Sequence, residues 1–158
     1  MAEETEHRRV GIALDPNTSD YVFDWSLKNF TRAGDKVILM HCEDDPRQYA
    51  VAYAGMPVAP LLVETEATRK QQVKDTKEFL APFIHKLNEA HIGHEAALLR
   101  GDARDALVDG TRELKVDTLI MGSRQLGAVK RALLGSVSTY CVHHCDCPVV
   151  VVRHPEHK

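Results

Sequence analysis

The stretch of residues 121–138, which reads MGSRQLGAVKRALLGSVS, carries the residue types best suited to holding an anion. It begins at the end of an apolar run, where Gly122 allows a sharp turn and a close approach of the backbone to a ligand. It ends in Gly135 and Ser136, which can open a helix whose unpaired amides and positive dipole end attract phosphate. Further donors in this stretch are Ser138, Arg124, Lys130 and Arg131. The pattern alone supports equally a polyphosphate-binding loop and a plain turn with an N-cap serine and solvated cations.

Two further polar residues lie where strands are expected to end. Asp15 could contact a nucleotide or a metal-bound phosphate, although Asp15-Pro16-Asn17 is also a good strand-to-helix turn, which the pattern favours. His41 could serve as a base, but the sequence offers no nucleophile that would complete a triad with it. A packed, hydrogen-bonded histidine is therefore the favoured interpretation of His41.

Cysteine and histidine residues between positions 141 and 147 form only part of a metal-binding pattern. Cys141 and Cys145 are four residues apart and share a face of the expected helix, whereas His143 points elsewhere and Cys147 begins a strand. Because the full set of ligands is missing, we expect no metal site formed by the protein itself.

Several signatures of efficient nucleotide hydrolysis are absent from the sequence. It contains no G-x-x-x-x-G-K-[ST] loop, no G-x-G-x-x-G, no G-x-S-x-G and no H-E-x-x-H. It also offers no convincing pair of carboxylates that would hold Mg²⁺. We therefore expect no proficient enzyme and at most slow ATP hydrolysis.

Five short β-rich runs are expected to form the strands that position these residues. They are largely apolar on both faces, which is typical of a parallel sheet that is covered on both sides. Right-handed crossovers then predict a doubly wound α/β fold whose ligand lies beyond the carboxyl ends of the strands. The pattern leaves the strand order open. The runs are Arg9–Asp15, Lys36–Cys42, Glu95–Arg100, Asp117–Gly122 and Pro148–Arg153.

Helices are expected between these strands. The longest runs from about Glu64 to His91, and Pro82 predicts a kink or a restart within it. The others are expected after Thr18 and Ser19, after Asp102, and from Gly135 to a point before Cys147. Because the sequence shows no repeat or linker, we expect one domain over residues 1–158, with its core at about 8–153.

The composition limits the class of protein. The chain has 158 residues, and 20 Lys and Arg against 23 Asp and Glu give a net charge of −3. This balance argues against a nucleic-acid-binding surface, and no apolar run approaches the ~20 residues that span a membrane. Residues 1–6 lack the apolar core of a signal peptide, and the four cysteines are few for a disulfide scaffold. We therefore expect a cytoplasmic protein with reduced thiols.

Residues 121–138 resemble the nucleotide-binding signature of the universal stress protein family, G-x2-G-x9-G-[ST]. Gly122, Gly135 and Ser136 match this signature at the right spacing, and Gln125 stands at the position of its second glycine. The similarity extends over nearly the whole chain, and the chain is most similar to the small single-domain eukaryotic type. It includes ALD at 13–15, LMHC at 39–42, GD at 101–102 and CPVVVV at 147–152.

The resemblance implies a particular fold and assembly. The fold would be a five-stranded parallel sheet of order 3-2-1-4-5 with helices on both faces, as in adenine nucleotide alpha hydrolase-like proteins. The assembly would be a homodimer through the last strand, because an exposed apolar edge invites pairing with another chain. The residues of that edge are Val149, Val150, Val151 and Val152.

The resemblance also implies ATP or AMP, with or without Mg²⁺, bound between the first and fourth strands. By position in the family pattern, the residues near the adenosine would be Ala13, Leu14, Asp15, Cys42 (through its backbone), Met121 and Gly122. The residues around the phosphates would be Gln125, Gly135, Ser136, Val137 and Ser138.

On this basis we expect a stress-response protein that uses an adenine nucleotide as the signal of a sensor or switch. The alternative is a stress-induced dimeric interaction or chaperone module that binds no nucleotide, since Gln125 leaves the signature one glycine short.

Overall fold

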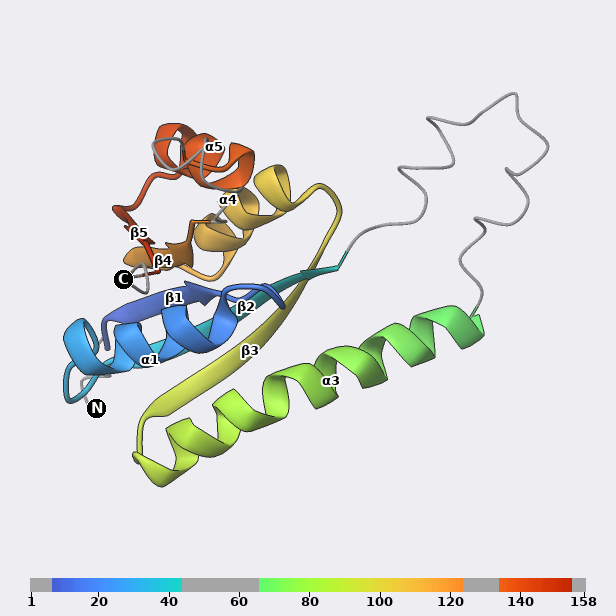
Figure 1. Ribbon diagram of the computed structural model, residues 1–158, viewed down its shortest axis with the longest axis horizontal. Coiled ribbons are helices and arrows are strands. Elements are labelled where there is room, and N and C mark those ends of the chain that lie inside the picture. The colour runs from blue at the N-terminus through green and yellow to red at the C-terminus, as the bar shows by residue number, and fades with distance from the viewer. Residues whose placement is uncertain (1–6, 44–65, 124–133, 155–158) are drawn as a thin grey trace, which may run out of the picture.

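The computed structural model describes residues 7–43, 66–123 and 134–154. Strands and helices alternate through these residues (Figure 1). The strands are β1 (Arg9–Ala13), β2 (Lys36–Glu43), β3 (Gly93–Arg100), β4 (Thr118–Gly122) and β5 (Val149–Val152). The helices are α1 (Ser19–Asn29), α3 (Glu66–Glu89), α4 (Ala103–Glu113) and α5 (Ser136–His144).

The five strands form one parallel sheet in the order β3-β2-β1-β4-β5. β1 lies at the centre, where Val10 pairs with Val37 of β2 on one side and with Thr118 of β4 on the other. The predicted doubly wound α/β fold and the strand order 3-2-1-4-5 are confirmed. Because all strands run in the same direction, their carboxyl ends meet at one edge of the sheet.

Helices cover both faces of this sheet. α1 and α3 lie on one face, and α4 and α5 lie on the other (Figure 1). Successive side chains of β2 enter opposite cores: Leu39 packs under α1 and α3, whereas Ile38 and Met40 pack under α4 and α5. All three side chains are fully buried, which explains why the strand is apolar without alternation.

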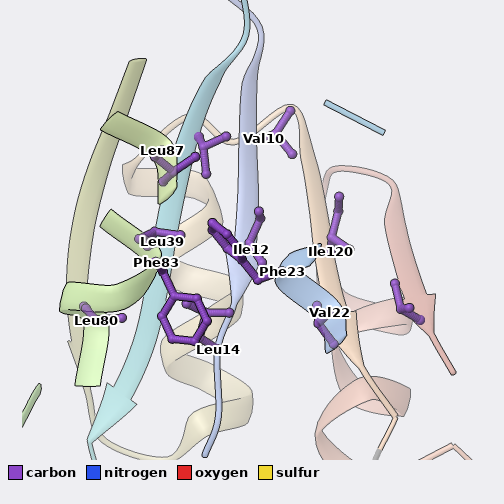
Figure 2. Close-up of a cluster of buried hydrophobic side chains, with 12 residues drawn as sticks. Val10, Ile12, Leu14, Val22, Phe23, Leu39, Leu80, Phe83, Leu87 and Ile120 are labelled. Atoms are coloured by element: carbon purple, nitrogen blue, oxygen red, sulfur yellow. The ribbon is translucent and has the colours of Figure 1, made fainter. Parts of the chain in front are cut away.

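The core under α1 and α3 is built around two phenylalanines (Figure 2). Phe23 of α1 and Phe83 of α3 approach to 5.0 Å between ring centroids above the central strand. This contact joins two helices that belong to different crossovers, and it therefore fixes where α3 lies on the sheet. The aliphatic side chains around it include Val10, Ile12, Leu14, Val22, Leu39, Leu80, Leu87 and Ile120.

α3 runs through Pro82 without interruption for 24 residues, so the predicted restart is wrong. Pro82 lies on the exposed side of the helix, where water can reach the carbonyl group that the missing N–H leaves unpaired. Leu80, Phe83 and Leu87 are buried on the opposite side and hold the helix against the sheet on both sides of the proline. Packing therefore outweighs the local preference of the proline to end a helix.

The part of the chain that the structure describes contains no helix that is both long and apolar enough to cross a membrane.

Asp35 ties the beginnings of β1 and β2 together. Its carboxylate accepts hydrogen bonds from Arg8 Nε at 2.9 Å, from Arg8 Nη2 at 2.5 Å and from the Arg32 amide at 2.7 Å. The Asp35 side chain is only 6% exposed, so the carboxylate depends on these donors rather than on water. The hydrogen bonds from Arg8 lower the pKa of Asp35 below its ordinary value of 3.8.

Replacing Asp35 with Asn should lower the free energy of unfolding at neutral pH by about 1.5–3 kcal/mol, because the bonds to charged Arg8 are weakened. Since the pKa of Asp35 is lowered by folding, its stabilisation is present above the unfolded-state pKa and is lost as pH falls through the folded-state pKa. Wild-type stability should therefore drop below pH 3.8 more steeply than that of Asp35→Asn. Urea titrations across this pH range measure both effects.

The matched control is Asp24→Asn. Asp24 pairs with Lys86 at 2.8 Å but is 61% exposed, so its loss should change stability by less than about 1 kcal/mol. Equal effects of the two substitutions would contradict the role given to Asp35.

Candidate functional site

A cavity of about 650 Å³ opens at the carboxyl edge of the sheet. The ends of β1, β2 and β4, the beginnings of α4 and α5, and the middle of α3 all contribute to its wall. This is the position at which doubly wound sheets bind ligands, because backbone groups and helix N-termini converge there.

Ten of the residues that the sequence assigned to a site lie in the wall of this cavity. The structure therefore brings together four separate segments: the end of β1, the end of β2, the end of β4 before residue 124, and the beginning of α5 after residue 133. The ten are Ala13, Leu14, Asp15, Cys42, Met121, Gly122, Gly135, Ser136, Val137 and Ser138. The other four assigned residues, Arg124, Gln125, Lys130 and Arg131, lie outside the described residues.

One wall of the cavity was missed by the sequence analysis. This wall is one face of α3. Two residues of β2, His41 and Glu43, contact this face of α3 and also line the cavity. The spacing of this α3 face continues the buried stripe of Leu80, Phe83 and Leu87 toward the helix N-terminus, which was the available signal. The face was overlooked because it is mostly polar: Gln72, Asp75, Thr76 and Phe79.

The N-terminus of α5 points its first amides toward the cavity. Gly135 is the N-cap, with φ −63° and ψ 161°, and as a glycine it has no side chain to cap the amides of the first turn. Ser136 and Val137 line the cavity beside it. Such an end carries a partial positive charge and suits an anion.

The sequence analysis suggested that the Ser138 hydroxyl could donate to a ligand. In the structure this hydroxyl already donates within the protein. Ser138 is 2% exposed, and its hydroxyl donates to the Gly135 carbonyl at 3.0 Å. Ser138 therefore stabilises the first turn of α5.

Asp15 forms the strand-to-helix turn that the sequence pattern favours, and it also lies at the cavity. Its Oδ1 accepts from the Asn17 amide at 2.9 Å, and its Oδ2 accepts from the Thr18 hydroxyl at 2.5 Å. These bonds build the turn from β1 into α1. The residue also lines the cavity, so the carboxylate is held in place at the ligand side of the turn.

Gly122 is required by the packing of α1. A Cβ added at this position would lie 2.6 Å from Thr18 Oγ1 and 2.8 Å from Val22 Cγ2, which are impossible contacts. The sequence analysis attributed this glycine to a sharp turn and to the approach of a ligand, and neither is needed to explain it. Gly135 differs, because a Cβ there would meet only Ser138 Oγ at 3.7 Å.

His41 is packed and hydrogen-bonded, as the sequence analysis favoured. Its Nδ1 lies 2.9 Å from the Leu14 carbonyl, which can only accept, so Nδ1 carries the proton. The ring also contacts that of Phe79, with 4.8 Å between centroids. These contacts join β1, β2 and α3 at the floor of the cavity.

Glu43 places a buried carboxylate on the α3 side of the cavity. The Thr76 hydroxyl donates to its Oε1, and Arg100 Nη2 lies 3.7 Å from its Oε2. The side chain is 9% exposed, and Oε2 receives no hydrogen bond from the residues that the structure describes. This side of the cavity is therefore acidic and disfavours an anion, in contrast to the α5 end.

The cysteine and histidine residues at 141–147 lie at the end of α5 and in the turn before β5. Within residues 7–43, 66–123 and 134–154, no group of three or more His, Cys, Asp or Glu could hold an ion. Cys141 is fully buried, and burial raises the pKa of its thiol to about 12; burial also raises the pKa of Cys147. The thiols therefore stay protonated and pack as apolar groups.

The contrast between the two glycines predicts opposite effects of adding a side chain. Gly122→Ala should lower the free energy of unfolding by about 1–3 kcal/mol, because the new methyl group displaces Thr18 and Val22. Gly135→Ser should leave stability within about 0.5 kcal/mol, since serine is a good N-cap and its Cβ has room. Thermal and denaturant unfolding compare the two, and a larger loss at Gly135 would refute this account.

Two proteins of Arabidopsis thaliana are similar in sequence to most of this chain. The universal stress protein PHOS34 of Arabidopsis thaliana is 34% identical over 163 residues, which cover 94% of this chain and 63% of the relative. The universal stress protein PHOS32 of the same organism is 31% identical over 159 residues, which cover 94% and 66%. The chain thus spans slightly less than two thirds of the length of these two relatives.

Solved structures share the fold at low sequence identity. A universal stress protein family protein of Arabidopsis thaliana with AMP bound has a TM-score of 0.63 and 23% identity, covering 94% of this chain and 92% of its own. A universal stress protein in complex with cAMP has a TM-score of 0.62 and 19% identity, covering 94% and 98%. The Archaeoglobus fulgidus universal stress protein in complex with dAMP has a TM-score of 0.62 and 15% identity, covering 92% and 97%.

A family model described as the universal stress protein family matches residues 6–153. Because this match spans nearly the whole chain, the chain belongs to the universal stress protein family.

Proposed function

We propose that the cavity at the carboxyl edge of the sheet binds an adenine nucleotide, AMP or ATP, the latter with or without Mg²⁺. The observation that carries this proposal is the uncapped N-terminus of α5, which faces a cavity whose other walls are partly apolar. Such an arrangement suits a ligand with an anionic end and a flat apolar part. Three structural neighbours that have this fold are bound to AMP, cAMP and dAMP, which supports the assignment.

The two ends of the cavity orient the nucleotide in this proposal. Phosphate oxygens accept hydrogen bonds from the amides of the first turn of α5, where Gly135 leaves room for them. The carboxylates of Glu43 and Asp75 keep the phosphates away from the α3 side. The adenosine then lies over the ends of β1 and β2, against Leu14, the Cys42 backbone and Met121.

We infer a sensor or switch rather than a proficient enzyme. The polar side chains best placed to act as bases are held in structural bonds: Asp15 in its turn, and His41 against Leu14 and Phe79. A ligand that bridges β1, β2 and α5 stabilises the folded protein by an amount that rises with the logarithm of the ligand concentration above its Kd. The nucleotide level in the cell would thereby set the population of the liganded protein, which downstream partners can distinguish.

A second part of the proposal is a homodimer through β5. β5 is an edge strand beside β4, and its Val149, Val150 and Val151 are only partly buried. The carbonyls of Pro148 and Val152 accept from β4, so by the two-residue period of a strand the amide and carbonyl of Val151 face outward. An unpaired apolar edge of this kind is stabilised by pairing with a second copy.

The nucleotide site is tested by Gly135→Asp. Aspartate is a favoured N-cap, so the fold should be kept, while its carboxylate occupies the amides and repels phosphate. We expect wild-type protein to bind AMP and ATP in titration calorimetry, and Gly135→Asp to bind both at least about tenfold more weakly, a cost of about 1.4 kcal/mol. Thr139→Asp is the matched control, because it adds the same charge to an exposed position one turn further along α5.

The outcomes separate the alternatives. Equal affinities for Gly135→Asp and wild type would place the nucleotide elsewhere on the protein. If neither AMP nor ATP binds wild type, and no adenine nucleotide is released on denaturation, the chain acts as the dimeric interaction or chaperone module instead.

The dimer is tested by light scattering at micromolar concentration. Wild type should have twice the chain mass of 17.7 kDa, and Val151→Pro should have that mass once, because proline removes the outward amide without touching the bonds to β4. Circular dichroism should show that the variant keeps the fold. A monomeric wild type would rule out the proposed assembly.

A further inference from the structure

Thr18 lies between Asp15, which follows β1, and Gly122, which ends β4. It is the N-cap residue of α1, yet its side chain does not cap the helix. Its hydroxyl turns back and donates to Asp15 Oδ2 at 2.5 Å. Thr18 does not itself line the cavity, whereas Asp15 does.

The position of the Thr18 side chain is fixed by β4. The site of the missing Cβ of Gly122 lies 2.6 Å from Thr18 Oγ1 and 2.7 Å from its Cβ, so the threonine fits over this glycine. Backbone bonds from the Thr18 and Ser19 amides to the Asp15 carbonyl, at 3.2 and 3.0 Å, hold the same turn from the other side. These contacts hold the threonine where its hydroxyl donates to the carboxylate.

The Asp15 carboxylate still has capacity for a ligand. Each of its oxygens has accepted one hydrogen bond, from Asn17 or from Thr18, and can accept another. A carboxylate repels a bare phosphate and accepts hydrogen bonds from donors such as hydroxyl groups. In the strand order β2-β1-β4, Asp15 follows the central strand, between Cys42 at the end of β2 and the α5 end of the cavity. For a nucleotide oriented as proposed above, this middle position is that of the sugar.

We propose that Thr18 is a positioning residue, which fixes the Asp15 carboxylate as an acceptor for the sugar hydroxyl groups of the bound nucleotide. The inference rests on the proposed function for the identity of the ligand. The chain of contacts from Gly122 through Thr18 to Asp15 does not depend on it.

The test compares two substitutions with two ligands. Thr18→Val keeps the shape that fits over Gly122 and removes the hydroxyl, whereas Thr18→Ser keeps the hydroxyl. The ligands are AMP and 2′,3′-dideoxy-AMP, which lacks the sugar hydroxyls. We expect Thr18→Val to bind AMP about 3- to 10-fold more weakly, the range of one net hydrogen bond, and to bind dideoxy-AMP within about twofold of wild type. Thr18→Ser should match wild type for both ligands.

Two results would overturn the proposal. One is a Thr18→Val variant that loses affinity for both ligands equally, which would indicate a general effect on the fold. The other is a Thr18→Ser variant that behaves like Thr18→Val, which would show that the methyl group and not the hydroxyl matters.

A ligand-free measurement separates this proposal from the proposed function. The Asn17 amide donates to the same carboxylate, so its proton resonance reports the position of Asp15. In the absence of nucleotide, this resonance should move in Thr18→Val and stay in place in Thr18→Ser. If wild type binds neither AMP nor dideoxy-AMP, the nucleotide assignment fails, and an unmoved Asn17 resonance in Thr18→Val refutes the positioning role by itself.

Discussion

Water must be excluded from both faces of a sheet whose strands carry apolar side chains on both sides. Here α1 and α3 cover one face, and α4 and α5 cover the other. Each covering helix belongs to a crossover that returns the chain to the same end of the sheet, so every strand is parallel to its neighbours. The requirement to bury both faces therefore also gathers the strand ends and the N-termini of α1, α4 and α5 at one edge. The cavity forms at this edge because the strand ends and helix N-termini meet there.

The cavity combines opposite electrostatic environments within about 650 Å³. The α5 end presents backbone amides, while the α3 side presents the carboxylates of Glu43 and Asp75. Between them lie apolar side chains such as Leu107 and Met121. A ligand that is charged at one end and apolar in the middle fits only one way round, because the amides of α5 and the carboxylates of Glu43 and Asp75 lie at opposite sides of the cavity.

The strand and helix patterns were enough to predict the doubly wound fold, because they are local. The strand order and half of the residues in the cavity wall were predicted from the resemblance to the family, to which the glycine spacing belongs. The α3 wall was not predictable in the same way. Thr76 and Gln72 are polar, and only the path of α3 across the sheet brings them to the cavity. Two further features depend on contacts between segments far apart in the chain, which no local pattern reports. One is that α3 continues through Pro82, and the other is that the packing of α1 requires a glycine at 122.

The close contact between Gly122 and Thr18 also bears on how this sequence can diverge. Any larger residue at 122 collides with Thr18 and with Val22, so that position stays closed unless residue 18 becomes smaller and Val22 also gives way. A smaller residue without a hydroxyl at 18 removes one of the two hydrogen bonds that hold the Asp15 carboxylate. The two positions are therefore epistatic, and the order of substitutions matters: a relative with a side chain at 122 must have found another way to hold its aspartate, or must have lost the need for it.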